Sequence, residues 1–119
     1  MIESIINRDE LVVSVQGPVG EIHRAPIDVV LDFGPDGSVV GLELMDPILR
    51  SGGALANSLA SLEQRRVLSF SPDADVAYLS LSGVHPISQR LRPAKLVIDE
   101  RDALARIEVG LEATPDYPE

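Results

Sequence analysis

The chain has no cysteine and no tryptophan, and only four aromatic side chains among its 119 residues. Without cysteine it forms no disulfide bond and binds no metal through thiolates, the ligands of iron–sulfur clusters and of most structural zinc sites. Hydrophobic residues nevertheless make up 45% of the sequence. The core must therefore be packed mostly with valine, leucine and isoleucine.

Basic charge and long hydrophobic runs are also scarce. The formal net charge is −9, which disfavours direct contact with nucleic acid or with an anionic membrane. No apolar run approaches the roughly 20 residues of a membrane span, and the first residues lack the basic region of a signal peptide. We therefore expect a cytoplasmic protein without a cofactor, whose partner is another protein, either a basic one or a second copy of the chain.

One sequence pattern occurs twice, about 66 residues apart. A duplicated unit predicts two halves related by pseudo-two-fold symmetry, in effect a fused homodimer. Five pairs of identical residues share a constant offset: Asp9 and Asp75, Ser14 and Ser80, Gly17 and Gly83, Arg24 and Arg90, and Asp36 and Asp102. Three further pairs deviate from that offset by one residue: Pro26 and Pro93, Asp32 and Asp99, and Glu43 and Glu108.

Strict alternation of apolar and polar residues predicts the β-strands of each copy. In residues 10–16, Leu11, Val13 and Val15 share one face, which is the pattern of a half-buried strand. Two further strands flank the turn-forming residues 34–37 and predict an antiparallel hairpin. The strands of the first copy are expected at 2–6, 10–16, 27–33 and 38–45, and those of the second at 67–70, 75–82, 95–99 and 103–109.

One segment departs from the β pattern. Leu55, Leu59 and Leu62 recur at helical spacing, and Arg65 and Arg66 follow where the helix dipole favours cations. We place this helix at about 54–66, after a short turn capped by Asp46-Pro47 and interrupted by Gly52-Gly53.

Together these patterns predict an α+β fold in a single domain spanning 1–119. Two antiparallel meander repeats, about 1–46 and 67–110, are joined by a helical linker at 47–66 and followed by an acidic tail at 111–119. We expect the repeats to form a sandwich or a partly open barrel whose opening the helix closes. The predicted core comprises Leu11, Val13, Val15, Val29, Leu31, Val40, Leu42 and Leu44 with their counterparts in the second copy.

The stretch from Phe70 to Leu81, with its aromatic opening, its acidic turn and its Val-Ala-Tyr-Leu strand, resembles domain of unknown function 2283. The first copy better keeps the other half of that pattern, at Val29–Phe33, the turn 34–37 and Val39–Asp46. The resemblance covers roughly 80 residues and implies a small antiparallel β unit. It brings no catalytic residues, and it implies an antitoxin-like role only through association with small toxin genes.

No arrangement of residues in the sequence predicts a catalytic or metal centre. Paired aspartates, such as Asp73 with Asp75 and Asp32 with Asp36, are typical of turns because their side chains bond the local backbone. His23 and His85, the only histidines, are expected in surface loops, although a shared site is left open.

Arg24 and Arg90 are the polar pair of most interest. As equivalent arginines near the pseudo-two-fold axis they would bind an anion or the carboxylates of a partner. The alternative is a solvated arginine, or an internal pair with Asp32 or Asp99.

The sequence thus favours a non-enzymatic protein-interaction module, with an antitoxin-like acidic protein as one form of it. The alternative is a small-ligand-binding protein or an enzyme that uses the loop histidines and aspartates. The ligand and partner candidates are Arg24, Arg90, His23 and His85.

Overall fold

The structure, a computed structural model, describes residues 2–7, 9–17, 20 and 22–111. These residues form one eight-stranded antiparallel sheet and two helices. The strands are β1 (Glu3–Asn7), β2 (Glu10–Ser14), β3 (Ile22–Phe33), β4 (Val39–Met45), β5 (Ser69–Ser71), β6 (Val76–Ser80), β7 (Ser88–Asp99) and β8 (Leu104–Gly110), and the helices are α1 (Pro47–Arg50) and α2 (Ala56–Gln64).

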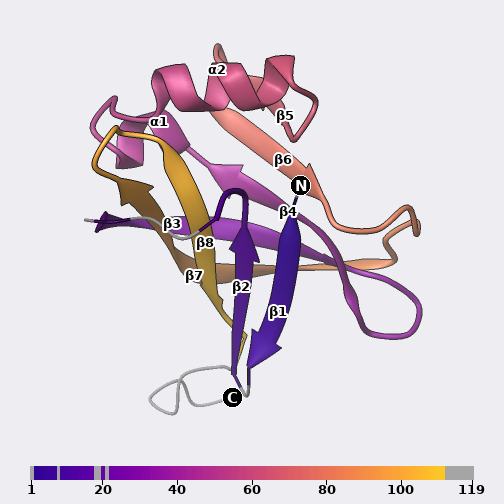
Figure 1. Ribbon diagram of the computed structural model, residues 1–119. Helices are drawn as coiled ribbons and strands as arrows, with labels where there is room; N and C mark the ends of the chain where they lie inside the picture. The colour runs from indigo at the N-terminus through magenta and orange to yellow at the C-terminus, as the bar shows by residue number, and fades with distance from the viewer. Residues whose placement is uncertain (1, 8, 18–19, 21, 112–119) are drawn as a thin grey trace.

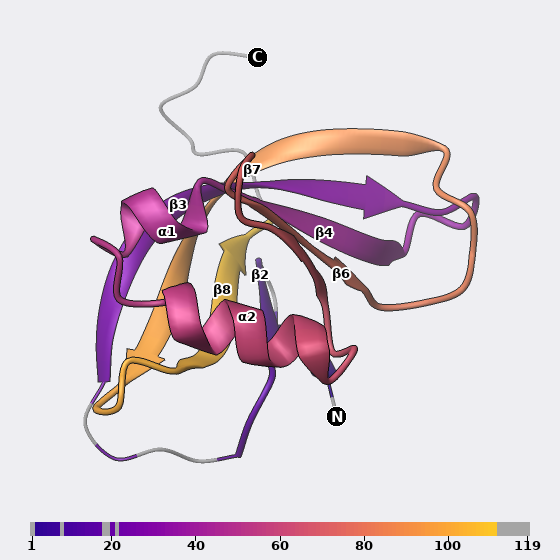
Figure 2. The same ribbon diagram turned by 90° about the horizontal axis from the view of Figure 1, so that it is seen from above.

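The sheet curls into a partly open barrel, and α2 lies across one open side of it (Figure 1 and Figure 2). This confirms the predicted antiparallel β fold with a closing helix. Leu55, Leu59 and Leu62 of the helical segment belong to the same buried cluster as the strands. Among the described residues, no helix is long and apolar enough to cross a membrane.

The two long central strands, β3 and β7, pair with each other over all twelve of their residues. They begin at Ile22 and Ser88, earlier than the predicted 27 and 95. Pro26 and Pro93 hid these extensions, because proline within a run normally argues against a strand. In this sheet Pro26 lies opposite Lys95, and Pro93 lies opposite Asp28.

The repeats are not two separate meanders, and this part of the prediction is wrong. The strand order is β1-β2-β8-β7-β3-β4-β6-β5. Strand β2 therefore pairs with β8 of the other half, and β6 pairs with β4. The reason is that β3 and β7 pair with each other at the centre of the sheet. The β1–β2 hairpin therefore lies on the far side of β7, next to β8, and the β5–β6 hairpin lies on the far side of β3, next to β4. The halves exchange their hairpins.

The ladders of the two halves correspond residue by residue. Val13 lies opposite Ile107, as Leu79 lies opposite Leu42. Both long hairpins also carry a register shift, after Asp32 in β3 and after Val97 in β7. These shifts fix an offset of 65 residues between β3–β4 and β7–β8, so Asp32 corresponds to Val97. The pairing of Asp32 with Asp99, inferred from residue identity, is wrong because it ignored the shift.

An aliphatic core fills the curl of the sheet. All eight core residues predicted for the first copy are buried, and so are their counterparts except for the half-buried Leu81. Two of them, Leu42 and Ile107, are fully inaccessible to solvent. The alternation of the sequence therefore predicted the core face of the strands, except at Val40 and Ala105, which the register shifts place outside the core cluster.

The helical segment is shorter than predicted and is divided in two. Gly52 and Gly53 adopt positive φ angles of 67° and 88° between α1 and α2, so they separate the helices as expected. The N-terminus of α1 is capped from the turn between β5 and β6, because the Asp75 carboxylate accepts hydrogen bonds from the backbone N–H groups of Ile48 (2.9 Å) and Leu49 (3.0 Å). Asp75 thus fastens the helical linker to the second half.

Candidate functional site

Arg24 lies in β3 and forms an ion pair on the outer face of the sheet. Its Nε donates to Oε1 of Glu108 at 2.9 Å, and a terminal nitrogen donates to Oε2 at 3.3 Å. The hydrogen bond from Arg24 lowers the pKa of the Glu108 carboxyl below its usual range. Neither Asp32 nor Asp99, the predicted internal partners, takes part. Arg24 therefore has its partner within the protein.

Arg90 does not join Arg24. In the β3–β7 ladder Arg24 lies opposite Val97, whereas Arg90 lies opposite Leu31. Residues 24 and 31 are an odd number of positions apart in one strand, so their side chains point to opposite faces. The structural offset of 65 residues makes Gln89, and not Arg90, the counterpart of Arg24. The predicted site formed by two equivalent arginines near the axis is therefore not assembled.

The two histidines are also separated. His23 lies near the start of β3, opposite Ile98, and not in a loop as predicted. His85 lies in the β6–β7 connection, two residues before Ile87, whose N–H bonds the carbonyl of Phe33 at the other end of β3. Both side chains are exposed. They share no site, and the described part of the chain brings no three His, Asp or Glu side chains together in a metal-binding group.

A buried polar cluster that the sequence did not reveal lies on the outer face. Asp32 is only 5% exposed, and its carboxylate accepts hydrogen bonds from the Tyr78 hydroxyl (2.9 Å) and from Nε2 of Gln89 (2.8 Å). Burial and the hydrogen bond to Asp32 raise the pKa of the Tyr78 hydroxyl. A Cβ at Gly41 would overlap this hydroxyl, so glycine is required beneath the ring. The only signal in the sequence was that glycine within a strand.

The other aspartates mostly stabilise turns, as predicted for this residue type. Asp36 accepts hydrogen bonds from the backbone N–H and the hydroxyl of Ser38. Asp99 accepts bonds from the backbone N–H groups of Arg101 and Ala103, which lower the pKa of its carboxyl. These carboxylates are engaged with local backbone and are not free for acid–base work.

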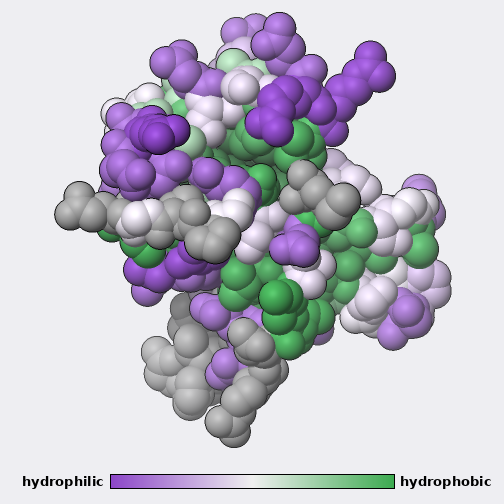
Figure 3. All heavy atoms as spheres, in the orientation of Figure 1, coloured by the Kyte–Doolittle hydropathy of each residue, from purple (hydrophilic) through white to green (hydrophobic). Residues whose placement is uncertain are grey.

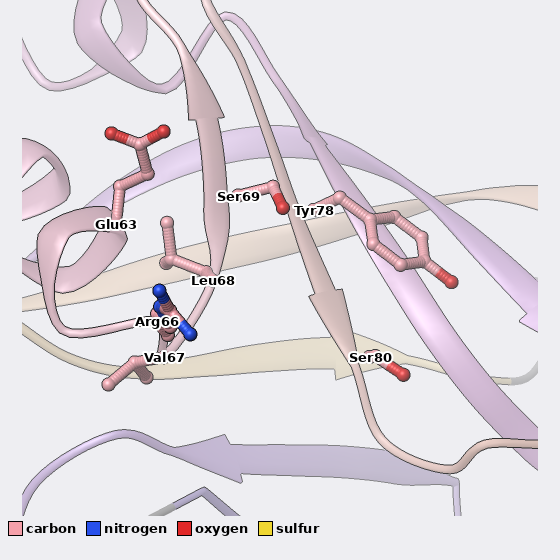
Figure 4. Close-up of a pocket in the computed structure, with 7 residues that line it drawn as sticks. All are labelled: Glu63, Arg66, Val67, Leu68, Ser69, Tyr78 and Ser80. Atoms are coloured by element: carbon pink, nitrogen blue, oxygen red, sulfur yellow. The ribbon is translucent and has the colours of Figure 1, made fainter.

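A polar cleft of about 450 Å³ lies beside Tyr78, at the C-terminal end of α2. Figure 4 shows the side chains of Glu63 and Arg66 on one side and those of Ser69, Tyr78 and Ser80 on the other. The cleft offers hydroxyl groups, one guanidinium and one carboxylate. None of its lining side chains is paired as nucleophile and base, and the Tyr78 hydroxyl donates to Asp32 instead.

A second groove of about 450 Å³ is lined by Arg90. We call it the Arg90–Arg92 groove, and its other main walls are Phe33, Ile87 and Leu111. Of the four predicted candidates, Arg90 lines one of the four cavities described for residues 2–7, 9–17, 20 and 22–111, whereas Arg24 and the histidines line none of these four.

Comparison of the chain with the models of known protein families, with curated protein sequences and with solved structures found no match.

Proposed function

We propose that the protein is a non-enzymatic protein-interaction module, and that a partner adds a strand to the edge of the sheet at β1. The observation that carries this proposal is the exposure of Ile5 and Ile6, which are 58% and 60% accessible to solvent in the middle of an edge strand. An edge strand presents unpaired backbone groups, and exposed apolar side chains on it favour pairing with another chain.

The two edges of the sheet differ in a way that favours β1. Strand β5, at the opposite edge, has only three residues, and its central Phe70 is buried. Strand β1 has five residues, and its neighbouring isoleucines point to opposite faces of the sheet. Figure 3 shows apolar side chains gathered over β1 on the face that it draws. A strand laid along this edge would cover an isoleucine on each face.

The arrangement of the halves supports a binding role of this kind. The matching ladders and the exchanged hairpins are those expected of a homodimer fused into one chain, with pseudo-two-fold symmetry about β3 and β7. In such a chain the two halves already pair with each other, so the β1 edge is available to a different protein. An antitoxin-like role, in which the acidic protein binds a basic toxin, is one form of this function.

The proposal is tested with one substitution on each edge. A partner is first identified by affinity enrichment and mass spectrometry and is then titrated calorimetrically. Ile5→Lys places a charge on the β1 edge and should weaken binding at least about tenfold. Ser71→Lys, on the exposed surface of β5, is the matched control and should leave the affinity unchanged.

Two results would contradict the proposal. The first is a partner affinity that Ile5→Lys does not alter. The second is turnover of a small substrate that is lost in His23→Ala or in His85→Ala, which would favour the enzyme alternative.

A further inference from the structure

The Arg90–Arg92 groove is basic, in contrast to the negative net charge of the whole protein. Arg90 and Arg92 are two residues apart in β7, so both side chains lie on the face that carries Val29 and Leu31 of β3. The groove also contains the apolar surfaces of Phe33, Ile87 and Leu111, and Ile87 is 66% exposed. None of the described residues that line it carries a carboxylate. It is therefore a basic and apolar groove in a protein of net charge −9.

The equivalent positions in the first half show why this groove is open. At the offset of 65 residues fixed by the hairpins, Arg90 and Arg92 correspond to Ala25 and Ile27. Those two residues are only 7% and 4% exposed, and α1 packs against their strand. In the first half this surface is thus part of the core. In the second half two guanidinium groups stand at the same positions.

Arg92 carries a polar group that lacks a partner. Its Nε is buried, and no group among the described residues accepts a hydrogen bond from it. A buried donor without an acceptor costs free energy, and a carboxylate in the groove would recover that cost only after the Arg92 side chain turns this nitrogen toward it. Arginine is well suited to that ligand, because its planar guanidinium bonds both carboxylate oxygens at once.

We propose that the Arg90–Arg92 groove binds a short acidic peptide segment of a partner protein. Carboxylates of the segment bond Arg90 and Arg92, and an apolar side chain between them packs on Phe33, Ile87 and Leu111. The inference rests on the proposed interaction function and names a second contact, separate from the β1 edge. Charge complementarity selects this occupant, because the groove presents two guanidinium groups and no carboxylate among the described residues that line it.

The test uses the full chain and a defined probe, the fluorescein-labelled peptide acetyl-Glu-Leu-Asp-Phe-Glu-amide, followed by fluorescence anisotropy. The amide counterpart, Gln-Leu-Asn-Phe-Gln, is the control peptide. We expect saturable binding of the acidic peptide alone. Arg90→Glu and Arg92→Gln should each weaken it at least about tenfold. Arg101→Glu, on an exposed turn, makes the same change of charge as Arg90→Glu and should leave binding unaltered.

Several outcomes would overturn the inference. They are no saturation at about 1 mM peptide, equal binding of the amide peptide, and an equal loss of affinity in Arg101→Glu. Binding that appears only in a chain ending at Leu111 would make residues 112–119 the occupant, and a dimer dissociated by the peptide in light scattering would make it a second copy. Circular dichroism of each variant establishes that it is folded, and Arg90→Lys, which keeps the charge, should retain part of the affinity.

The experiments distinguish failure of the groove proposal from failure of the β1-edge proposal. Ile5→Lys should not change the affinity for the acidic peptide, because β1 does not line the groove. If the peptide fails to bind while the partner still responds to Ile5→Lys, the groove inference is wrong and the interaction function stands.

Discussion

At the scale of single residues, the two halves use different polar pairs at equivalent positions of the outer face. In the first half Arg24 bonds Glu108. In the second half the counterpart of Arg24 is Gln89, which bonds the buried carboxylate of Asp32. The accepting carboxylate thus lies on β8 in the first case and on β3 in the second, where Tyr78 donates a further hydrogen bond to it. The two halves thus satisfy the side chains at these positions with different hydrogen-bond partners.

The glycine beneath Tyr78 gives a prediction at this scale. Gly41→Ala should destabilise the protein by about 1–3 kcal/mol, because the added methyl group displaces the phenol and leaves the Asp32 carboxylate short of a donor. In a Tyr78→Val background, which copies Val12 of the first half, the same change should cost much less. Urea melts of the four proteins measure this coupling. Equal costs in both backgrounds would show that the ring does not require the glycine.

Asp99 gives a prediction about pH. Its folded pKa is lowered, chiefly by the backbone N–H of Ala103, against about 3.9 for an unfolded aspartate. The unfolded chain therefore binds the proton first on acidification. The stabilisation is fully present above about pH 4 and is lost as the pH falls through the lower folded pKa. Asp99→Ala should lose about 1–3 kcal/mol at neutral pH, and its urea midpoint should fall less on acidification than that of the wild type. A parallel decline of both midpoints would contradict this assignment.

At the scale of secondary-structure elements, stability depends on which face of the equivalent strands β4 and β8 points to the core. Leu42 and Ile107 occupy equivalent, fully buried positions in them. Each strand therefore presents one continuous apolar row to the core, and α2 covers part of the same cluster.

Truncating either residue should be costly. Leu42→Ala and Ile107→Ala are each expected to lower the free energy of unfolding by about 2–5 kcal/mol, a large share of a typical domain stability of about 5–15 kcal/mol. Leu91→Ala, at a position that is 61% exposed, is the control and should change little. Equal free energies of unfolding for all three variants would show that Leu42 and Ile107 do not face the core, and that the strand phase given above is wrong.

At the scale of the whole molecule, the exchanged hairpins make the halves interdependent. Residues 1–66 contain β1, β2, β3 and β4, yet β2 has its ladder partner in β8 and β4 has one in β6. A half expressed alone must therefore leave strand edges unpaired or pair with a second copy of itself.

This leads to a prediction for separated halves. Fragments 1–66 and 67–119 should each be unfolded or dimeric when alone, and they should form a one-to-one folded complex when mixed. Circular dichroism and light scattering report the two properties. A monomeric, fully folded fragment from either half would contradict the interdependence.

The sequence predicted the strands, the core face and the helix, because alternation and helical spacing are local patterns. It did not predict which strand pairs with which, since β2 would be just as well buried beside β3 as beside β8. Asp32 and Tyr78 come together only because their strands lie in the same sheet, so a local sequence pattern could not predict their cluster. The offset taken from matching residues placed Arg24 with Arg90, and only the pairing of β3 with β7 showed that their side chains point to opposite faces of the sheet.

The exchange of hairpins also has a consequence for synthesis of the chain. The β1–β2 hairpin leaves the ribosome before β8, its partner strand, has been made. The hairpin, with its exposed isoleucines, stays unpaired until every strand from β3 to β8 has been translated, and contacts between such distant segments form slowly. On one messenger RNA, the hairpin of a nascent chain would therefore be able to pair with a neighbouring chain before its own β8 is made. Faster translation would increase the fraction of chains that fold as monomers.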